Sequence, residues 1–297
     1  MTDISKGKRA RSSVFSAVLS WLSAEVVPLV QPKLAKILAA ELQRHFDEHL
    51  LPELHRRVEA IVEDRLSERI EAIIDREFQR RREAIIDSEI AATESPIASK
   101  VLVERFTHVF QENLWGAIET VSGFGSRKDS LSVVEALSAL KMAKTNVDFM
   151  SINDIPCGDF NWIEIFLKSA PEVRYRGYDI VSTLIKRNRI SYPSYWFGML
   201  DITSTSPPYA DLIFSKDLFN HLTYEDINKA IGNMKKSDAK YLLASNNFDF
   251  PNQELPANIG GCSRYLDLCA EPFNLPSPIW HTNYMGLWQF ASINVKE

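Results

Sequence analysis

Acidic residues follow three successive apolar runs in the second half of the chain. Asp154 closes the first run and leads into a turn that contains Gly158. Asp179 lies 21 residues after Gly158, and Asp201 lies 22 residues after Asp179. In open α/β sheets ligands bind at the carboxyl ends of strands, and an acid about 20 residues past a glycine turn suits the hydroxyls of a ribose. This spacing therefore predicts a nucleoside site at one edge of a parallel sheet.

A second pair of reactive side chains, Asp217 and His221, follows a fourth apolar run that ends at Phe214. On a short helix, residues four apart share one face. His221 could then remove a proton from an attacking hydroxyl while Asp217 orients its ring. Two alternatives stay open, because a lone histidine also suits a core or capping position, and a group transfer can proceed through alignment without any base.

Strands and helices alternate regularly from Phe149 onward, which predicts a parallel sheet with right-handed crossovers. The expected strands lie near residues 149–153, 174–178, 195–200, 210–214, 239–245, 264–269 and 286–294. The helices between them are expected to start near Trp162, Val181 and Thr223, with a further helix beyond Phe248. This order positions the acidic residues at strand ends.

The chain from Val101 to Val295 resembles the class I S-adenosylmethionine-dependent methyltransferases. In that family the first turn usually reads Asp-x-Gly-x-Gly-x-Gly. Asp154 and Gly158 fit this pattern, whereas Pro156 and Phe160 stand where glycines are usual. Glycine lets the backbone approach a ligand closely, so this departure bears directly on the site.

The narrower likeness is to one bacterial branch of this family, and four segments carry it. They are Ser122 to Ser126, the turn from Asp154 to Trp162, Asn258 to Gly261, and Pro272-Phe273.

The resemblance implies S-adenosyl-L-methionine as cofactor, an α/β fold, and a Rossmann-like seven-stranded methyltransferase sheet that ends in an antiparallel hairpin. It implies that Asp179 holds the ribose hydroxyls, that Asp201 lies near the adenine amino group, and that Asp217 to Leu222 lies beside the transferable methyl. The cofactor-binding residues implied in this way are Asp154, Pro156, Cys157, Gly158, Asp179, Ile180, Asp201, Ile202 and Ser126. Asp217 and His221 are the catalytic candidates.

The loop from Ser122 to Ser126 lies between helices expected at Val101 to Trp115 and at Asp129 to Lys144. In the family resembled, the segment before the first strand often closes over the cofactor. The two glycines among serines also suit a plain tight turn, so both interpretations stand.

The composition excludes several classes of protein. The 297 residues include 34 Lys and Arg and 39 Asp and Glu, which gives a net charge of -5. This charge is spread evenly along the chain, so no nucleic-acid-binding surface is indicated. The three cysteines show no Cys-x-x-Cys pairing, and hence neither a disulfide framework nor a zinc site is expected. No metal is predicted, and a reducing cytoplasm fits best.

Residues 1–96 are expected to form a separate helical region. Within it, residues 13–30 place Phe15, Val18 and Leu22 on one helical face, after a basic start. A helix packed on protein, a peripheral membrane helix aided by Trp21, and a cleaved signal peptide are the alternatives. The run is too short for a confident membrane span.

Further helices are expected from Lys33 to Leu51, ending near Pro52, and from Glu53 to Ala91. In the second, apolar residues recur at nearly every fourth position, which makes an apolar stripe that winds around the helix. A lone helix this charged needs a partner for its apolar side. We expect a homo-oligomer through residues 53–91, as a coiled-coil candidate, with packing on the chain's own second domain as the alternative.

The sequence thus predicts a methyltransferase-like catalytic domain at residues 97–297 and a helical N-terminal region that oligomerises or anchors. The reaction implied by the resemblance is transfer of a methyl group to a hydroxyl or amine of a small-molecule or saccharide acceptor. The alternatives are a non-catalytic scaffold that acts through its helices, and an NAD-dependent oxidoreductase, for which the first turn supplies only Gly158 of the fingerprint glycines.

Overall fold

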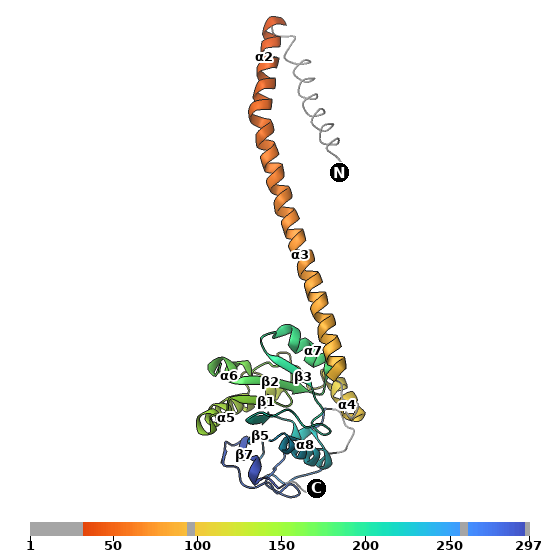
Figure 1. Ribbon diagram of the computed structural model, residues 1–297, viewed down its shortest axis with the longest axis vertical. Helices are drawn as coiled ribbons and strands as arrows, with labels where there is room; N and C mark the ends of the chain where they lie inside the picture. Colours follow the sequence, from red (N-terminus) through yellow and green to blue (C-terminus); the bar gives the residue numbers. More distant parts are fainter. Residues whose placement is uncertain (1–31, 94–98, 256–260, 295–297) are drawn as a thin grey trace. The chain divides into compact units, whose positions relative to one another are not determined.

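Seven strands form one mixed sheet in the computed structural model, which describes residues 32–93, 99–255 and 261–294. Their order is β3-β2-β1-β4-β5-β7-β6 (Figure 1). The bounds are β1 Ser151–Asp154, β2 Arg174–Asp179, β3 Trp196–Met199, β4 Leu212–Ser215, β5 Tyr241–Ser245, β6 Trp280–His281 and β7 Met285–Gln289. Strands β1 to β5 are parallel, while β7 runs antiparallel to both β5 and β6. The predicted methyltransferase sheet with its closing antiparallel hairpin is confirmed.

The register brings the predicted acids to one edge of the sheet. Strand β1 lies between β2 and β4, and Asp154 at its end is opposite Gly177 on one side and Phe214 on the other. Asp179 closes β2 and pairs with Met199 of β3. Because parallel strands end at the same edge, the turns that follow β1, β2 and β4 meet there.

The helices begin close to where the sequence places them. Their bounds are α4 Lys100–Gln111, α5 Leu131–Val147, α6 Glu164–Ser169, α7 Ser182–Ser191 and α8 Tyr224–Lys236, with 3-10 turns at Phe124–Ser126, Phe219–His221 and Phe290–Ser292. Ser99, Ser130 and Thr223 cap α4, α5 and α8 by accepting a backbone N–H. Such caps contribute about 1 kcal/mol each and fix the first turn of a helix.

Two layers of apolar side chains cover the two faces of the sheet. Leu212 and Phe214 of β4 pack with α5 and α6 on one face, and Ile213 between them packs with α8 on the other. This alternation follows from the strand period of two residues. Leu102 of α4 joins the α8 layer, and Ile185 of α7 joins the α5 layer. Both faces are therefore closed, and the strand ends stay open to a ligand.

The sixth strand predicted at residues 264–269 is wrong. Those residues form no strand, and β6 is the short segment Trp280–His281. Leu266 and Leu268 are buried, as is Asp267 between them, and the N–H groups of the two leucines donate to the Oδ1 atoms of Asn247 and Asn246. Asparagine side chains thus satisfy the backbone without a strand partner. The helix predicted beyond Phe248 is also missing from the described residues 249–255.

The described N-terminal residues are helical throughout. Helix α2 (Pro32–His45) runs into a π-helical turn (Phe46–Leu50) and then into α3 (Leu51–Thr93), with no residue between them. The predicted end near Pro52 is wrong. Pro52 has no backbone N–H to donate, so the regular hydrogen-bond pattern of an α-helix must change near it. The wider π-helical turn at Phe46–Leu50, just before Pro52, provides this change, and the helix continues.

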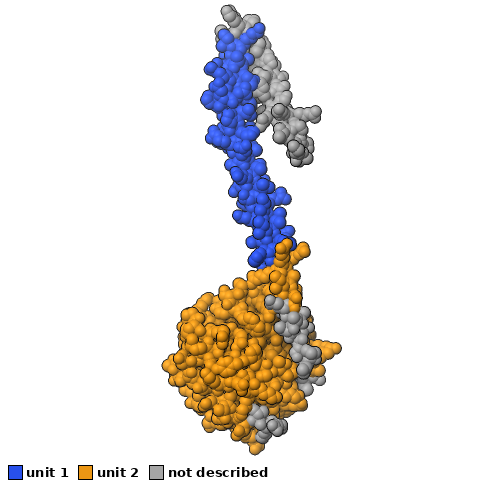
Figure 2. Space-filling model, viewed as in Figure 1, with its two compact units in different colours: residues 1–79 blue, residues 80–297 orange. Residues whose placement is uncertain are grey.

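The structure divides into two units, residues 1–79 and residues 80–297 (Figure 2). The division falls within α3, whereas the boundary predicted at residue 96 lies outside the described residues. Within the second unit, the last turns of α3 are held by α7. Ile86 is buried in the core, and Lys186 Nζ lies 2.9 Å from Asp87 Oδ2. Residues 80–93 therefore belong structurally to the sheet domain.

The helix expected at residues 13–30, with peripheral membrane contact as one of its three alternatives, lies outside the described residues. Across residues 32–93, 99–255 and 261–294, every helix is too short or too polar to cross a bilayer.

Candidate active site

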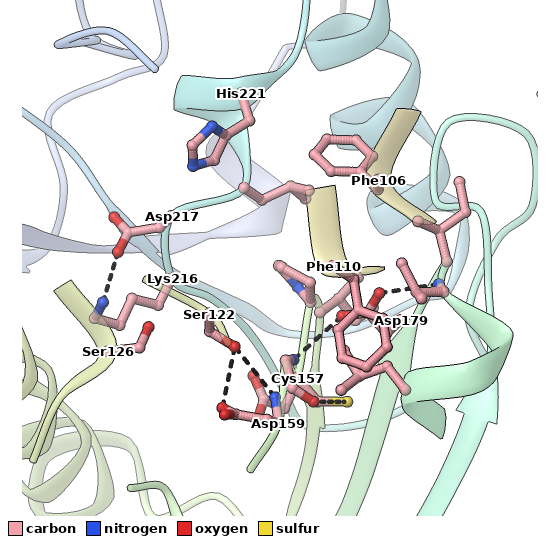
Figure 3. A pocket seen from close by; sticks show the side chains of 18 of the residues that line it. Phe106, Phe110, Ser122, Ser126, Cys157, Asp159, Asp179, Lys216, Asp217 and His221 are labelled. Atoms are coloured by element: carbon pink, nitrogen blue, oxygen red, sulfur yellow. Dashed lines mark hydrogen bonds and ion pairs between the residues drawn. The ribbon is translucent and has the colours of Figure 1, made fainter. Parts of the chain in front are cut away.

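A pocket opens at the carboxyl ends of β1, β2 and β4 (Figure 3). It encloses about 1160 Å³ of empty space, part of it open to solvent. All eleven predicted site residues line it: Ser126, Asp154, Pro156, Cys157, Gly158, Asp179, Ile180, Asp201, Ile202, Asp217 and His221. Phe106 and Phe110 of α4, which the sequence did not single out, also line the pocket. The fold thus gathers residues from four strand ends and from α4 around one space.

The first turn has the geometry of a close backbone approach. Gly158 adopts a φ of +52°, and a Cβ atom there would lie 2.4 Å from Ser122 Oγ. Phe160, at a usual glycine position, also has a positive φ of +58°. Its ring packs against Tyr175, Tyr192, Tyr195 and Phe197 at centroid distances of 4.7–5.3 Å. Aromatic packing thus offsets the strain that a bulky residue meets in this region.

Asp154, at the end of β1, is buried beside the turn. Its Oδ2 accepts a hydrogen bond from the Tyr175 hydroxyl at 2.8 Å. Burial raises the pKa of the Asp154 carboxyl to about 8, against the opposing effects of Tyr175 and Lys216. A buried carboxyl of this kind is ready to ionise when a cation comes near.

Asp179 links the first two turns. Its Oδ2 accepts from the Gly158 N–H at 3.2 Å and its Oδ1 from the Val181 N–H at 3.0 Å. Burial raises the pKa of the Asp179 carboxyl to about 6, while these backbone hydrogen bonds oppose the shift. Each oxygen keeps accepting capacity, so the carboxylate can receive hydroxyl donors from a ligand in the pocket.

Asp201 accepts more hydrogen bonds from the protein itself than Asp179 does. One oxygen accepts from the Ser99 N–H at 2.7 Å, and the other accepts from the N–H and hydroxyl of Thr203 at 2.9 and 2.7 Å. Ser99 also caps α4, so Asp201 holds the start of the helix that carries Phe106 and Phe110. Its contact with an adenine remains a prediction.

Asp159 is a structural anchor that the sequence analysis did not assign. Its carboxylate accepts from the Thr120 hydroxyl at 2.9 Å, the Val121 N–H at 3.0 Å and the Ser122 hydroxyl at 3.1 Å. Segment 120–122 is thereby bound to the first turn (Figure 3). The signal was present in the sequence, because an acid directly after the turn glycine can bind backbone and hydroxyl donors that approach the turn.

A buried ion pair closes the side of the pocket that follows β4. Lys216 Nζ lies 2.5 Å from Asp217 Oδ2 and donates to the Gly125 carbonyl at 2.9 Å. The Tyr284 hydroxyl donates to Asp217 Oδ1, and the Asp217 N–H donates to Ser245 Oγ at 2.8 Å. The Asp217 carboxylate raises the pKa of Tyr284, together with burial. Lys216 and Tyr284 were missed, since only the fold brings them to Asp217.

His221 is oriented by a different group from the one predicted. Its Nδ1 lies 2.7 Å from the Cys262 carbonyl, which can only accept, so Nδ1 carries the proton and Nε2 is the free acceptor. Its ring lies against Trp115 at 4.9 Å between centroids. Burial and the nearby Arg105 and Arg264 lower the His221 pKa. The helix predicted to hold Asp217 and His221 together is only a 3-10 turn that begins at Phe219.

The Cys157 thiol, the absence of a metal-binding cluster among the described residues and the charge of the pocket lining limit the reactions that the site can support. Burial raises the pKa of the Cys157 thiol well above its usual value, which disfavours a thiolate nucleophile. Within the part of the chain that the structure describes, no cluster of histidine, cysteine and carboxylate groups could hold a metal ion. The pocket contains five aspartates and one lysine, so it favours a ligand that carries positive charge.

No family model matches the chain. A trans-aconitate 2-methyltransferase from Rhodopseudomonas palustris (strain BisB18) is 24% identical over 157 residues, which cover 45% of this chain and 60% of that protein. The chain therefore spans less than two thirds of the curated relative that it matches.

Two solved structures illustrate the structural likeness. Magnesium protoporphyrin IX methyltransferase from Synechocystis PCC 6803, with bound SAH, has a TM-score of 0.45 at 10% identity, covering 64% of this chain and 97% of that one. N-methyltransferase NodS from Bradyrhizobium japonicum WM9, in complex with SAH, has a TM-score of 0.39 at 18% identity, covering 48% and 74%. The strand order of this chain, with β7 antiparallel between β5 and β6, agrees with the seven-stranded sheet that the resemblance to class I methyltransferases implied.

Proposed function

We propose that the chain is an S-adenosylmethionine-dependent methyltransferase that acts on a hydroxyl or amine of a small-molecule or saccharide acceptor. The strand order, the pocket at the strand ends and the partial likeness to a trans-aconitate 2-methyltransferase support this proposal. The acceptor type is proposed from the resemblance, since the matched relative shares only part of its length with this chain.

The position of Asp179 supports the cofactor assignment most directly. It closes β2, lines the pocket and accepts one backbone N–H on each carboxylate oxygen, so each oxygen can accept a further hydrogen bond. A carboxylate with these free lone pairs can accept both hydroxyls of a ribose.

The charge of the pocket suits a cationic cofactor. S-adenosylmethionine would supply an electrophilic methyl group on a positively charged sulfur, together with an ammonium group. Asp154 lies at the end of β1, with its carboxyl on the verge of ionisation, and Asp159 and Asp217 lie nearby in the lining. A carboxylate in a partly desolvated pocket favours a cation strongly, so Asp154 would hold the ammonium group at the amino-acid end of the cofactor.

His221 is the base in this proposal. Its Nδ1–H is held by the Cys262 carbonyl, so a neutral ring leaves Nε2 free to accept a proton, either from a hydroxyl as it attacks the methyl group or from a neutral amine once its nitrogen has been methylated. Asp217 stays bonded to Lys216 and Tyr284, so it shapes the pocket wall and does not orient the histidine. Alignment of the two reactants would supply the remaining rate enhancement.

The two alternatives have less support. A dinucleotide-binding sheet has the order 3-2-1-4-5-6 with parallel strands, whereas here β7 runs antiparallel between β5 and β6. A scaffold without catalysis would not need a buried, turn-bonded Asp179 or an oriented His221.

The N-terminal helix is proposed to join copies of the chain. Six apolar residues of α3 are 48–66% exposed: Val58, Val62, Leu66, Ile70, Ile74 and Phe78. Such a row on a charged helix gains stability by packing against a second copy. A membrane contact through residues 13–30 and a cytoplasmic location stay predictions.

The proposal is tested by calorimetric titration of the full chain with S-adenosylmethionine and, separately, with NADH. We expect micromolar binding of the first alone, weakened at least about tenfold in Asp179→Asn, because charge-assisted hydrogen bonds to the ribose are lost. Asp249→Asn, at an exposed site, is the matched control and should bind normally. A folded wild-type chain that binds neither compound would favour the scaffold, and one that binds only NADH would favour the oxidoreductase.

A further inference from the structure

Arg264 has a guanidinium group whose nitrogen atoms are buried and make no hydrogen bond to the described part of the chain. Its Nε, Nη1 and Nη2 atoms are shielded from solvent, and none has a partner among the described residues. The backbone N–H of Arg264 donates to the Asn220 carbonyl at 3.2 Å, which places this residue beside the turn that carries His221. Its guanidinium lies over the Tyr224 ring at 5.2 Å.

The nearest acid does not neutralise this charge by contact. Glu254 acts on Arg264 electrostatically, but its two oxygens accept the Tyr224 N–H at 3.1 and 3.0 Å, and one also accepts the Leu255 N–H. Burial lowers the pKa of Arg264 more than these neighbours raise it. A buried guanidinium without a contacting anion is costly, and buried charges are otherwise paired.

Other unpaired or positive groups lie at the same place. The buried Oδ1 of Asn220 has no partner among the described residues either. Arg105 donates through Nη2 to the His221 carbonyl at 2.7 Å, and both arginines lower the His221 pKa through their charge. Two positive side chains therefore act together on His221.

We propose that Arg264 binds an anionic oxygen group, a carboxylate or a phosphate, of the methyl acceptor beside His221. A guanidinium offers parallel N–H donors that match the two oxygens of such a group. The Asn220 Oδ1 can accept a hydroxyl of the same molecule. The pocket is lined by five aspartates and attracts positive charge, whereas Arg105 and Arg264, which act through their charge on the lining residue His221, attract negative charge. This difference in charge would separate the binding positions of the cofactor and of an anionic acceptor group.

This inference rests on the proposed methyltransferase function and narrows it. The acceptor would carry an acidic group as well as the nucleophilic hydroxyl or amine, with the acid held by Arg264 and the nucleophile directed at His221 Nε2. Neutral sugars and simple amines would be poor acceptors.

The test uses the full chain without cofactor, and succinate and inorganic phosphate as probes. NMR titration of the histidine ring protons follows His221, identified by its loss in His221→Gln. A bound anion offsets the positive charge near the ring, so we expect either probe to raise the His221 pKa, with saturation in the millimolar range. Binding should weaken about tenfold or more in Arg264→Gln. Arg264→Lys keeps the charge and should bind with intermediate affinity.

Arg187→Gln, at an exposed arginine of α7, is the matched control and should bind both probes as the wild type does. Thermal unfolding gives a second readout, because an anion that binds only the folded protein stabilises it. Phosphate should therefore raise the Tm of the wild type and of Arg187→Gln, and leave that of Arg264→Gln unchanged.

Equal probe binding by wild type and Arg264→Gln, or no binding by the folded wild type, would overturn the inference. Calorimetry with S-adenosylmethionine on the same samples separates this failure from failure of the proposed function. Cofactor binding without anion binding contradicts only the Arg264 assignment, whereas anion binding without cofactor binding upholds the site and contradicts the methyltransferase proposal. If Arg264→Gln does not fold, Arg264→Lys still tests the inference. Unchanged affinity of Arg264→Lys for succinate and phosphate would exclude a bidentate contact between the guanidinium and the anion.

Discussion

The Lys216 ammonium group donates a hydrogen bond to the Gly125 carbonyl at 2.9 Å, although 91 residues separate the two in sequence. Lys216 follows β4, and Gly125 lies in the loop that precedes α5. The same ammonium group lies 2.5 Å from Asp217 Oδ2. One buried cation therefore ties the 122–126 loop to the strand end where the transferable methyl is proposed to lie. Of the two interpretations of this loop, the covering role gains support.

Lys216→Met should loosen this loop without emptying the core, because the methionine side chain can occupy much of the same space. We expect S-adenosylmethionine affinity to fall about tenfold, the typical effect of losing a charge-assisted hydrogen bond. Calorimetry measures it, with Lys128→Met as control, since Lys128 is an exposed lysine near the same loop. Equal affinities in both variants would mean that the contact does not organise the site.

Gly158→Ala should destabilise the domain by about 1–3 kcal/mol, because the added Cβ meets Ser122 Oγ at 2.4 Å and the backbone there has a positive φ. Adding Ser122→Gly removes the colliding side chain. The double variant should recover part of the loss, and the remainder reports the backbone strain. Urea unfolding of the two single variants and the double variant measures the coupling, which would be absent if the turn simply shifts away from Ser122.

The raised pKa of Asp154 predicts that the free energy of unfolding falls as the pH rises. Its folded-state pKa of about 8 exceeds the usual value of 3.8, so the folded protein binds the proton more tightly than the unfolded chain does. The stabilising contribution is complete below pH 3.8 and is lost as the pH rises toward 8. Asp179, with a pKa of about 6, adds the same trend between pH 3.8 and 6.

Asp154→Asn should therefore flatten the fall in unfolding free energy between pH 6 and pH 8, measured by urea unfolding. Asp249→Asn, at an exposed acid, should leave the slope unchanged. A wild type whose stability is constant over this range would show that Asp154 ionises normally.

His221→Gln should lower kcat by about 10²–10⁴, the usual contribution of a positioned base, with unchanged cofactor affinity. Because burial lowers the His221 pKa, the wild-type rate should persist below pH 6.5 and decline only as the pH falls through that lowered value. An acceptor assay over pH 5–8 measures both effects, and His108→Gln, at an exposed histidine of α4, is the control. Full activity in His221→Gln would point to catalysis by alignment alone.

The row of six exposed apolar residues on α3 predicts that the full chain self-associates as its concentration rises. Replacing Ile70 and Ile74 together by Glu places charges in the proposed contact and should give monomers in sedimentation velocity. Replacing the exposed polar pair Glu68 and Arg69 by Gln should leave the association state as it is. A wild type that is monomeric at every concentration tested would contradict the proposed oligomer.

Local signals were sufficient for much of the fold. The strands that end near Asp154 and Asp179 and the helix start expected near Thr223 are each predicted from neighbouring residues, and the structure has β1, β2 and α8 there. Residues 264–269 show where such signals fail. The Leu266-Asp267-Leu268 sequence alternates apolar and polar residues, as a strand does. In the structure, however, the side chains of Asn247 and Asn246 accept the backbone N–H groups of the two leucines, which no local sequence pattern reveals.

The sequence by itself determined the first five strands and the helices between them, the acids at the strand ends, and the glycine turn after the first strand, because these depend on periodicity and on short-range backbone preferences. Tertiary structure alone decided which side chains share the pocket. It brought Lys216 to Gly125, Tyr284 to Asp217 and the Cys262 carbonyl to His221, and it left the Arg264 guanidinium buried without a partner among the described residues. These contacts join residues far apart in sequence, and their distances, burial and charge exist only once the sheet has formed.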